Sequence, residues 1–293
     1  MPDQSRPRPS RRAILLQAGA LGLAACQPGG AACPPVRTGL QLYSVRQAMA
    51  ISVPRTLERV AGLGYGAVEF AGYFDQAPAE IATQLAASGL VSPSAHVDAR
   101  ASRADPARVV AEGARAGHQY LVVGWIPPED RSSLADWQGW ADSLNRFGEA
   151  CHMAGLRCAY HNHDFEFLPV EGPGMGGRVT PWDVLLERCD PSLVAFEIDT
   201  YWALHAGTDP AVLVARDPDR FPLCHIKDRA ADGSMAVLGE GETDFAPILS
   251  ARGPGGFEQC YAELDNPVSA FGFASAAEPA LSEILRTNQT CPA

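Results

Sequence analysis

From about residue 37 onward, the chain alternates between short runs of β-branched or aromatic residues and longer stretches rich in Ala, Leu and Glu. The short runs are typical of strands and the longer stretches of helices. The pattern predicts eight strands, at residues 39–43, 67–70, 91–97, 120–123, 157–161, 193–198, 223–226 and 259–263. It predicts helices between them at residues 54–63, 77–88, 106–116, 134–154, 182–188 and 245–251. Such an alternation indicates βα units around a parallel sheet.

The ends of the predicted helices follow ordinary start and stop chemistry. Several helices begin with Pro or Asp near the first turn, and four are followed by Gly64, Gly89, Gly117 and Gly155. Eight βα units in about 255 residues match the usual extent of a (β/α)8 barrel. The alternative is a doubly wound open sheet, but no GxGxxG sequence follows the first predicted strand to hold a pyrophosphate. The sequence therefore predicts an α/β fold with a single TIM-barrel domain at residues 37–293.

The first 25 residues are typical of an export signal. Four arginines lie within the first 12 residues, and Gln17 is the only polar residue in the apolar run at 13–25, which is too short to span a bilayer. The sequence SRRAIL at 10–15 resembles a twin-arginine export signal, and LAAC at 23–26 resembles a lipobox in which Cys26 is lipidated. These features predict a signal peptide at 1–25, a tether at 26–36, and an exported lipoprotein on the periplasmic side. The alternative is a basic tail followed by an ordinary apolar helix.

Composition narrows the classes of protein that remain. The chain has 293 residues, 46% hydrophobic and 19% charged, which is typical of a globular protein. With 23 basic and 34 acidic residues, its net charge of −11 disfavours a nucleic-acid partner. The eight cysteines include no CxxC pair and are too sparse for a disulfide scaffold. In an oxidising compartment we expect Cys33 to pair with Cys291, which would join the two ends of the domain.

The predicted strands end in residues that can carry chemistry. In a (β/α)8 barrel the functional side chains come from the carboxyl ends of the strands. Those positions hold Glu69, His96, Asp98, Trp125, residues 161–166, Glu197, Asp199, His225, Lys227, Asp228, Glu263 and Asp265. Carboxylates and imidazoles that converge on one barrel mouth are costly to bury unless they are paired, and one Mn, Co, Zn or Mg ion would compensate them. Taken singly, each residue could instead cap a helix or pair with an arginine.

Several segments resemble a known family. They are GLQLYSVR at 39–46, GYGAVEF at 64–70, YHNHDFEF at 160–167, HIKD at 225–228 and GEGETDF at 239–245. Together they resemble the sugar phosphate isomerase/epimerase group of the xylose isomerase-like TIM barrels, from about residue 37 to about residue 286. The YHNHDFEF segment is the most specific of them.

The resemblance implies a metal site and a mechanism. One divalent cation would be held by Glu166, Asp199, His225 and Glu263. Family members often place the first Glu at the end of strand five itself, where this chain has Tyr160 and His161, so His161 or His163 is the alternative first ligand. The resemblance further implies that a proton is removed next to a carbonyl and that the enediolate is held on the cation. Glu166 or Glu263 would be the base.

The resemblance also assigns residues to the substrate, a small-molecule carbohydrate. His161, His163 and Lys227 would donate to substrate oxygens, with Glu69 and His96 deeper in the pocket. Trp125, Trp202 and Phe74 would form the apolar platform for a sugar ring, or would instead belong to the core. The sequence has no run of Arg or Lys that would clamp a phosphate, which favours a neutral or oxidised sugar.

Several functions remain open at this stage. The first is a sugar or keto-sugar isomerase/epimerase. The second is a lyase, dehydratase or hydrolase that acts on 3-keto-glycosides or keto-inositols at the same site. A non-catalytic, lipid-anchored sugar-binding protein is a third, since a fold does not determine activity. A metal nuclease is disfavoured by the acidic balance of the chain.

Overall fold

The computed structural model describes residues 37–170, 179–254 and 256–288. The predicted signal peptide and tether lie outside the described residues, as do Cys26, Cys33 and Cys291. Export, lipidation and the Cys33–Cys291 pair therefore stay predictions. Within the described ranges, no helix has both the length and the apolar character needed to cross a membrane.

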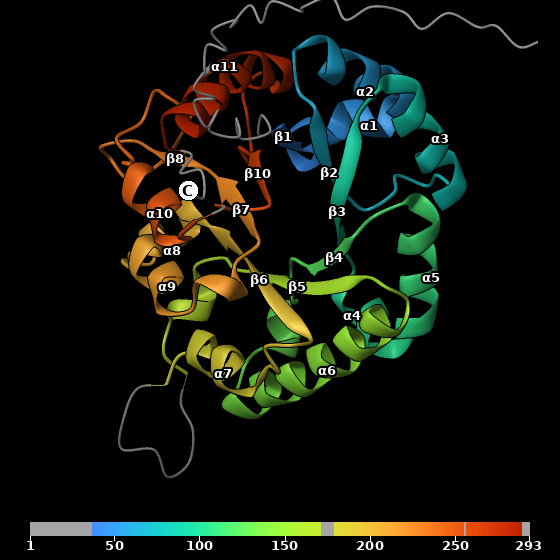
Figure 1. The fold of residues 1–293 in the computed structure, drawn as a ribbon. Helices are drawn as coiled ribbons and strands as arrows, with labels where there is room; N and C mark the ends of the chain where they lie inside the picture. Colours follow the sequence, from blue (N-terminus) through green and yellow to red (C-terminus); the bar gives the residue numbers. More distant parts are fainter. Residues whose placement is uncertain (1–36, 171–178, 255, 289–293) are drawn as a thin grey trace, which may run out of the picture. The chain divides into compact units, whose positions relative to one another are not determined.

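Eight parallel strands close into a barrel (Figure 1). They are β1 (Thr38–Gln41), β2 (Ala67–Ala71), β3 (Val91–Val97), β4 (Tyr120–Val123), β5 (Arg157–His161), β6 (Val194–Asp199), β7 (Leu223–Ile226) and β10 (Gln259–Ala262). Strand β1 closes the ring, because Gly39 pairs with Ala67 on one side and with Tyr261 on the other. The predicted (β/α)8 barrel is confirmed, and each predicted strand agrees with the observed one to within two residues at either end.

Helices surround the barrel (Figure 1). They are α1 (Arg46–Ile51), α2 (Val53–Gly62), α3 (Pro78–Ser88), α4 (Ala99–Ala104), α5 (Pro106–Ala116), α6 (Leu134–Met153), α7 (Pro181–Arg188), α8 (Thr200–His205), α9 (Pro210–Arg216), α10 (Ala246–Ala251) and α11 (Ala270–Asn288). The six predicted helices, now α2, α3, α5, α6, α7 and α10, are present to within one residue at either end. The sequence pattern does not predict the other five helices, nor the small hairpin of β8 (Asp228–Arg229) and β9 (Met235–Ala236).

Local side-chain chemistry explains where several of these helices begin and end. The Asp98 side chain accepts a hydrogen bond from the Ala101 N–H at the start of α4, and Ser133 and Asp136 form a capping box at the start of α6. Helices α3 and α5 end at Gly89 and Gly117, whose φ angles of 74° and 89° are in the left-handed region that glycine adopts without strain.

The strands carry two different sets of buried side chains. One set, with residues such as Val68, Phe196 and Ile198, belongs to the large apolar core that also includes side chains of the surrounding helices. The other set alternates with it along the strands and begins with a small apolar cluster of Tyr120, Val122, Ala159, Ala195 and Leu223. Two residues further along β5, β6 and β7, the same alternation places polar side chains at the carboxyl end of the barrel.

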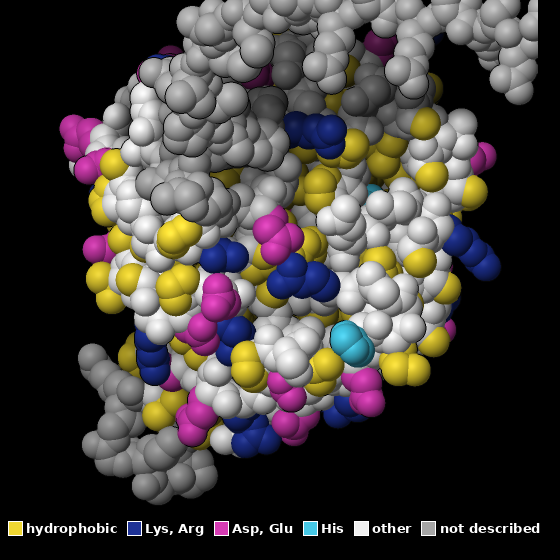
Figure 2. All heavy atoms as spheres, viewed as in Figure 1, with side chains coloured by type: hydrophobic (Ala, Val, Ile, Leu, Met, Phe, Trp, Pro, Cys, Tyr) yellow, Lys and Arg dark blue, Asp and Glu magenta, His cyan; other side chains and the backbone are white. Residues whose placement is uncertain are grey.

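Figure 2 shows acidic and basic side chains interspersed over the part of one face that the described residues form. The described residues of that face therefore form no concentrated positive field of the kind that binds a nucleic-acid backbone.

Candidate metal and substrate site

Two linked clusters of ionisable side chains lie at the carboxyl ends of the strands. The inner cluster contains His96 from β3, His161 from β5, Glu197 from β6 and His225 from β7. The outer cluster contains Asp199, His225 and Glu263. His225 belongs to both, because its two ring nitrogens face opposite ways.

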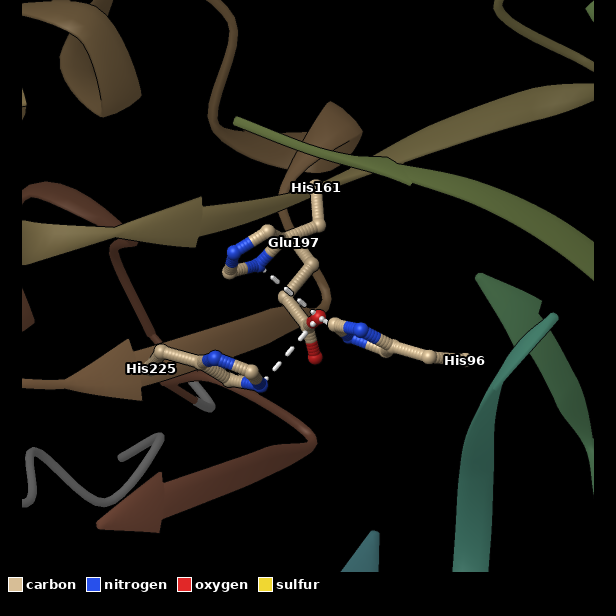
Figure 3. A group of neighbouring side chains, drawn as sticks. All are labelled: His96, His161, Glu197 and His225. Carbon is tan, nitrogen blue, oxygen red and sulfur yellow. Dashed lines mark hydrogen bonds and ion pairs between the residues drawn. The ribbon is translucent and has the colours of Figure 1, made fainter. Parts of the chain in front are cut away.

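In the inner cluster, three imidazole rings surround the Glu197 carboxylate (Figure 3). Glu197 Oε2 lies 2.8 Å from His96 Nε2, 3.2 Å from His161 Nδ1 and 3.2 Å from His225 Nε2. Burial and the nearby Glu69 charge work to raise the pKa of Glu197, but His225 and His161 outweigh them and lower it to about 2. Glu197 is therefore a carboxylate although it is completely buried.

A second buried carboxylate, Glu69, lies beside the same rings. Glu69 Oε2 is 2.6 Å from His225 Nε2 and accepts a hydrogen bond of 2.7 Å from Gln41 Nε2. Burial works to lower the pKa of His96, but the charges of Glu69 and Glu197 prevail and raise it to about 9. The inner cluster is thus a network of charges that are largely compensated within the protein.

His161 and Lys227 lie beside the three side chains of the outer cluster. His225 Nδ1 lies 2.7 Å from Glu263 Oε2 and 4.0 Å from Asp199 Oδ2, and His161 Nε2 lies 3.7 Å from Asp199 Oδ2. The Lys227 ammonium is 2.9 Å from both Asp199 Oδ2 and Glu263 Oε2, and 2.6 Å from Asp265 Oδ1. Burial raises the pKa of Asp199 to about 6, although Lys227 and His225 act in the opposite direction.

These donor atoms fit a divalent cation. A four-coordinate ion with bonds of about 2.0–2.1 Å separates its ligands by roughly 3.4 Å, and the separations in the outer cluster lie on either side of that value. Asp199 Oδ2 and His225 Nδ1 are buried and take part in no hydrogen bond, although Lys227 forms an ion pair with the former and Glu263 with the latter. Imidazole nitrogen with carboxylate oxygen is a donor set typical of Zn, Mn, Co or Mg sites.

Glu166, which the family pattern suggests as the first ligand, lies elsewhere. It sits in the short 3-10 helix Phe165–Phe167, where its Oε1 accepts from the Tyr160 hydroxyl at 2.5 Å and its Oε2 accepts from the His163 N–H at 2.8 Å. Glu166 belongs to neither cluster, whereas His161 contacts both. The structure therefore brings His161, the alternative first ligand, to Asp199, His225 and Glu263, and does not bring Glu166 there.

A cavity of about 820 Å³ opens above the outer cluster. Of the residues predicted to contact substrate or move protons, those that line it are His96, Trp125, His161, His163, Trp202, Lys227 and Glu263. Glu69, Phe74 and Glu166 are not among the lining residues. Its size is within the range of small-molecule sites in proteins.

Aromatic rings form one wall of the cavity. His163 stacks on Phe165 with ring centroids 5.3 Å apart, and Trp125 meets His163 edge-on at 5.1 Å. Trp125 is 49% exposed, so an apolar face is available to a ligand at the mouth. Burial, together with Lys227, holds the pKa of His163 well below its usual value.

Gln41 and Arg131 belong to the site but are not predicted from the sequence. Gln41 hydrogen-bonds Glu69 and lies at the carboxyl end of β1, so the strand-end rule could have found it. Arg131 lines the cavity and stacks over the Phe165 ring, with 3.2 Å between its guanidinium carbon and the ring centroid. It lies in the loop between β4 and α6, where no periodic signal marks a functional position.

Comparison with known proteins now identifies the family. The family model described as "Xylose isomerase-like TIM barrel" matches residues 57–259. The chain belongs to this family. The resemblance inferred from the sequence segments is confirmed.

Among relatives, the inosose dehydratase of Geobacillus kaustophilus is 25% identical over 236 residues, which cover 67% of this chain and 74% of that protein. The inosose dehydratase of Clostridium tetani is 26% identical over 142 residues, so this chain spans less than half, 45%, of its length. Among solved structures, a sugar phosphate isomerase/epimerase from Parabacteroides distasonis is 26% identical, with a TM-score of 0.74, and the match covers 86% of this chain and 96% of that one. The relatives are thus named as enzymes of more than one reaction type.

Proposed function

We propose that this protein is a metal-dependent enzyme that removes a proton next to a carbonyl in a sugar or keto-sugar. The observation that carries the proposal is the convergence of Asp199, His225, Glu263 and His161 at the base of a cavity whose wall is aromatic. The proposed activity is that of an isomerase or epimerase, with its substrate a neutral or oxidised carbohydrate.

His161 Nε2, His225 Nδ1 and one oxygen each of Asp199 and Glu263 would hold the cation. When bound, a divalent cation supplies a Lewis acid that polarises neighbouring substrate oxygens and stabilises negative charge that develops on them. Each ligand comes from or directly after a different strand, so the closed barrel fixes their mutual positions.

Lys227 and His163 are the proposed proton-transfer groups. Both line the cavity, and both lie beside Trp202, with the Lys227 ammonium 5.9 Å and the His163 ring centroid 5.6 Å from the centre of the indole. The Lys227 ammonium, which Asp265 also holds, would donate to a substrate oxygen. We assign proton acceptance to His163 rather than to Glu166, which does not line the cavity, or to Glu263, which lies among the proposed metal ligands.

A second candidate is dehydration of a keto-inositol or a similar ring, and the inosose dehydratase relatives favour it. Both reactions begin with removal of the same kind of proton. They differ in what happens next, because elimination also requires that a hydroxyl be protonated as it departs. The product therefore distinguishes the two candidates.

The first test is the metal content of the purified protein. We expect about one divalent cation per chain in the wild type and in Glu166→Gln, and its loss in Asp199→Ala, His225→Ala and His161→Ala. If His161→Ala retains the cation and Glu166→Gln loses it, Glu166 is the first ligand instead. Wild-type protein that binds no cation even on titration would overturn the proposal and favour a sugar-binding protein.

The second test follows the chemistry. Keto-hexoses, 3-keto-glucosides and inososes are incubated with the loaded protein in deuterated water, and proton NMR records exchange beside the carbonyl. If the proton beside the carbonyl exchanges and the product is a sugar of the same elemental composition as the substrate, the protein is an isomerase or epimerase. If the product has lost water, it is a dehydratase. Metal-loaded protein that exchanges no proton in any of these classes would contradict the proposed activity.

A further inference from the structure

Beneath the proposed metal ligands, a chain of hydrogen bonds crosses the barrel interior from β1 through β2 to β7. Gln41 Nε2 donates to Glu69 Oε2 at 2.7 Å, and the same oxygen lies 2.6 Å from His225 Nε2. Gln41, Glu69 and His225 are all fully buried. The strands that carry Gln41 and Glu69 pair in the barrel, with these two residues in register, whereas β7, which carries His225, pairs with β6 and β10.

The two nitrogens of His225 have different surroundings. Nε2 faces the Glu69 carboxylate, whereas Nδ1 faces Glu263 and Asp199 in the outer cluster. A neutral imidazole has one N–H and one lone pair, so a hydrogen bond from Nε2–H to a carboxylate leaves the lone pair on Nδ1. That is the nitrogen that faces the proposed cation.

Glu69 has no direct route to the substrate. It is not among the residues that line the cavity, and its nearest partners are Gln41, His96 and His225. The substrate-binding role that the family resemblance suggests for Glu69 therefore has no contact to support it. A buried carboxylate that accepts from a ligand histidine instead fits the pattern in which an outer carboxylate fixes the tautomer and ring orientation of the ligand.

We propose that Glu69 is a positioning residue, held by Gln41, that fixes the His225 ring and its Nδ1 lone pair for metal binding. The inference rests on the proposed function, because it requires a cation at the outer cluster. Glu197 supports the same ring less directly, at 3.2 Å from His225 Nε2, and is itself hydrogen-bonded to His96.

The test measures cation affinity rather than turnover. Zn²⁺ or Co²⁺ dissociation constants are determined by competition with a chromophoric chelator for the wild type, Glu69→Gln, Gln41→Leu and Glu166→Gln. We expect Glu69→Gln to weaken binding by about 10–100-fold and Gln41→Leu to weaken it less, in the same direction. Glu166→Gln is the matched control, since Glu166 is equally buried and hydrogen-bonded but contacts neither cluster, so its affinity should equal that of the wild type.

A spectroscopic readout separates positioning from a general loss of stability. The visible spectrum of the Co²⁺-loaded protein reports ligand geometry, and we expect it to change in Glu69→Gln but not in Glu166→Gln. The same variants are melted thermally to establish that each is folded. If Glu69→Gln does not fold, the affinity and Co²⁺ spectrum of Gln41→Leu decide the question.

The outcomes distinguish this inference from the proposed function. If Asp199→Ala loses the cation while Glu69→Gln and Gln41→Leu bind it as tightly as the wild type, with the same Co²⁺ spectrum, Glu69 is not a positioning residue and the metal site stands. If Asp199→Ala binds the cation as the wild type does, the proposed site itself is wrong. Weaker binding in Glu69→Gln with an unchanged Glu166→Gln supports the inference.

Discussion

Glu166 illustrates how the environment of a single residue decides its role. Its carboxyl group is completely buried and accepts hydrogen bonds from the Tyr160 hydroxyl and the His163 N–H. Burial raises the pKa of Glu166 to about 7, although these hydrogen bonds act to lower it. A group whose pKa is higher in the folded state stabilises the fold below its ordinary pKa, and that contribution is lost as the pH rises through about 7.

We therefore expect the wild type to lose stability between pH 5 and pH 8 through ionisation of Glu166, by on the order of 3 kcal/mol for a displacement of this size. The variant Glu166→Gln removes the ionisation and should show a flatter profile. Thermal melts of both proteins over that pH range, with chelator present, provide the measurement. Glu149→Gln, at an exposed position on α6, should retain the wild-type profile. If the stability of the wild type and that of Glu166→Gln change with pH in the same way, ionisation of Glu166 is not the cause of the loss.

Asp228 belongs to a sequence motif of the family but has a structural role in this protein. It belongs to the HIKD segment, but its carboxylate accepts hydrogen bonds from the Gly239, Gly241 and Thr243 N–H groups. A Cβ at Gly241 would lie 2.3 Å from Asp228 Oδ1, so only glycine allows this approach. The GEGETDF segment therefore wraps around Asp228, and the two motifs form one structural unit.

At the level of elements, the packing of α6 against the segment before β6 depends on the absence of a side chain at Gly148. A Cβ on Gly148 would lie 2.6 Å from the Leu193 carbonyl oxygen, just before β6. In the same helix, a Cβ on Gly139 would lie 3.5 Å from its nearest neighbour, Arg103 Nη2, which is an ordinary contact. The two glycines thus have the same helical setting but different packing.

We expect Gly148→Ala to destabilise the protein by about 1–3 kcal/mol, because backbone atoms of the neighbouring segment would have to move. Gly139→Ala should instead stabilise it by about 0.5–1 kcal/mol, since alanine is the better helix former and meets no obstacle. Urea denaturation of both variants measures the difference. Equal effects of the two substitutions would show that the contact with Leu193 does not limit the packing of α6.

Elements that follow a strand without a linker escape prediction from the sequence pattern. Helix α8 begins at the residue after β6, and Asp199 both ends the strand and caps the helix through the Trp202 N–H. No turn residue separates the alternating pattern of the strand from the helical pattern that follows it. Helix α11 contains Pro279, a residue that ordinarily argues against a helix interior.

At the level of the whole molecule, the proposed ligands join distant parts of the chain. His161, Asp199, His225 and Glu263 lie at the ends of four neighbouring strands. In an unfolded chain these residues are not held together, so a cation that binds them stabilises only the folded state.

We expect the melting temperature to rise when a cation is added, by about 5–10 °C at 100 times the dissociation constant, since binding then contributes about 2.7 kcal/mol. A chelator should reverse the rise, and Asp199→Ala should abolish it. Differential scanning calorimetry of the wild type and this variant, with and without cation, is the measurement. The same increase in Asp199→Ala would place the binding site elsewhere in the chain.

The sequence by itself determined the number and order of the strands, the helices with clear periodicity, the barrel and the family. Local periodicity encodes these features, because each strand and helix must present its apolar residues to the core. The strand-end rule also gathered Asp199, His225 and Glu263 on one face of the barrel. Only the tertiary structure places His161 rather than Glu166 beside Asp199, and Glu69 beside His225. The Glu166 side chain lies in a short 3-10 helix and points away from the proposed metal ligands. Glu69 and His225 are in contact although 156 positions separate them in the sequence. Side-chain direction in a tight turn, and contact between side chains of strands that do not pair, depend on tertiary packing, which the local sequence does not encode.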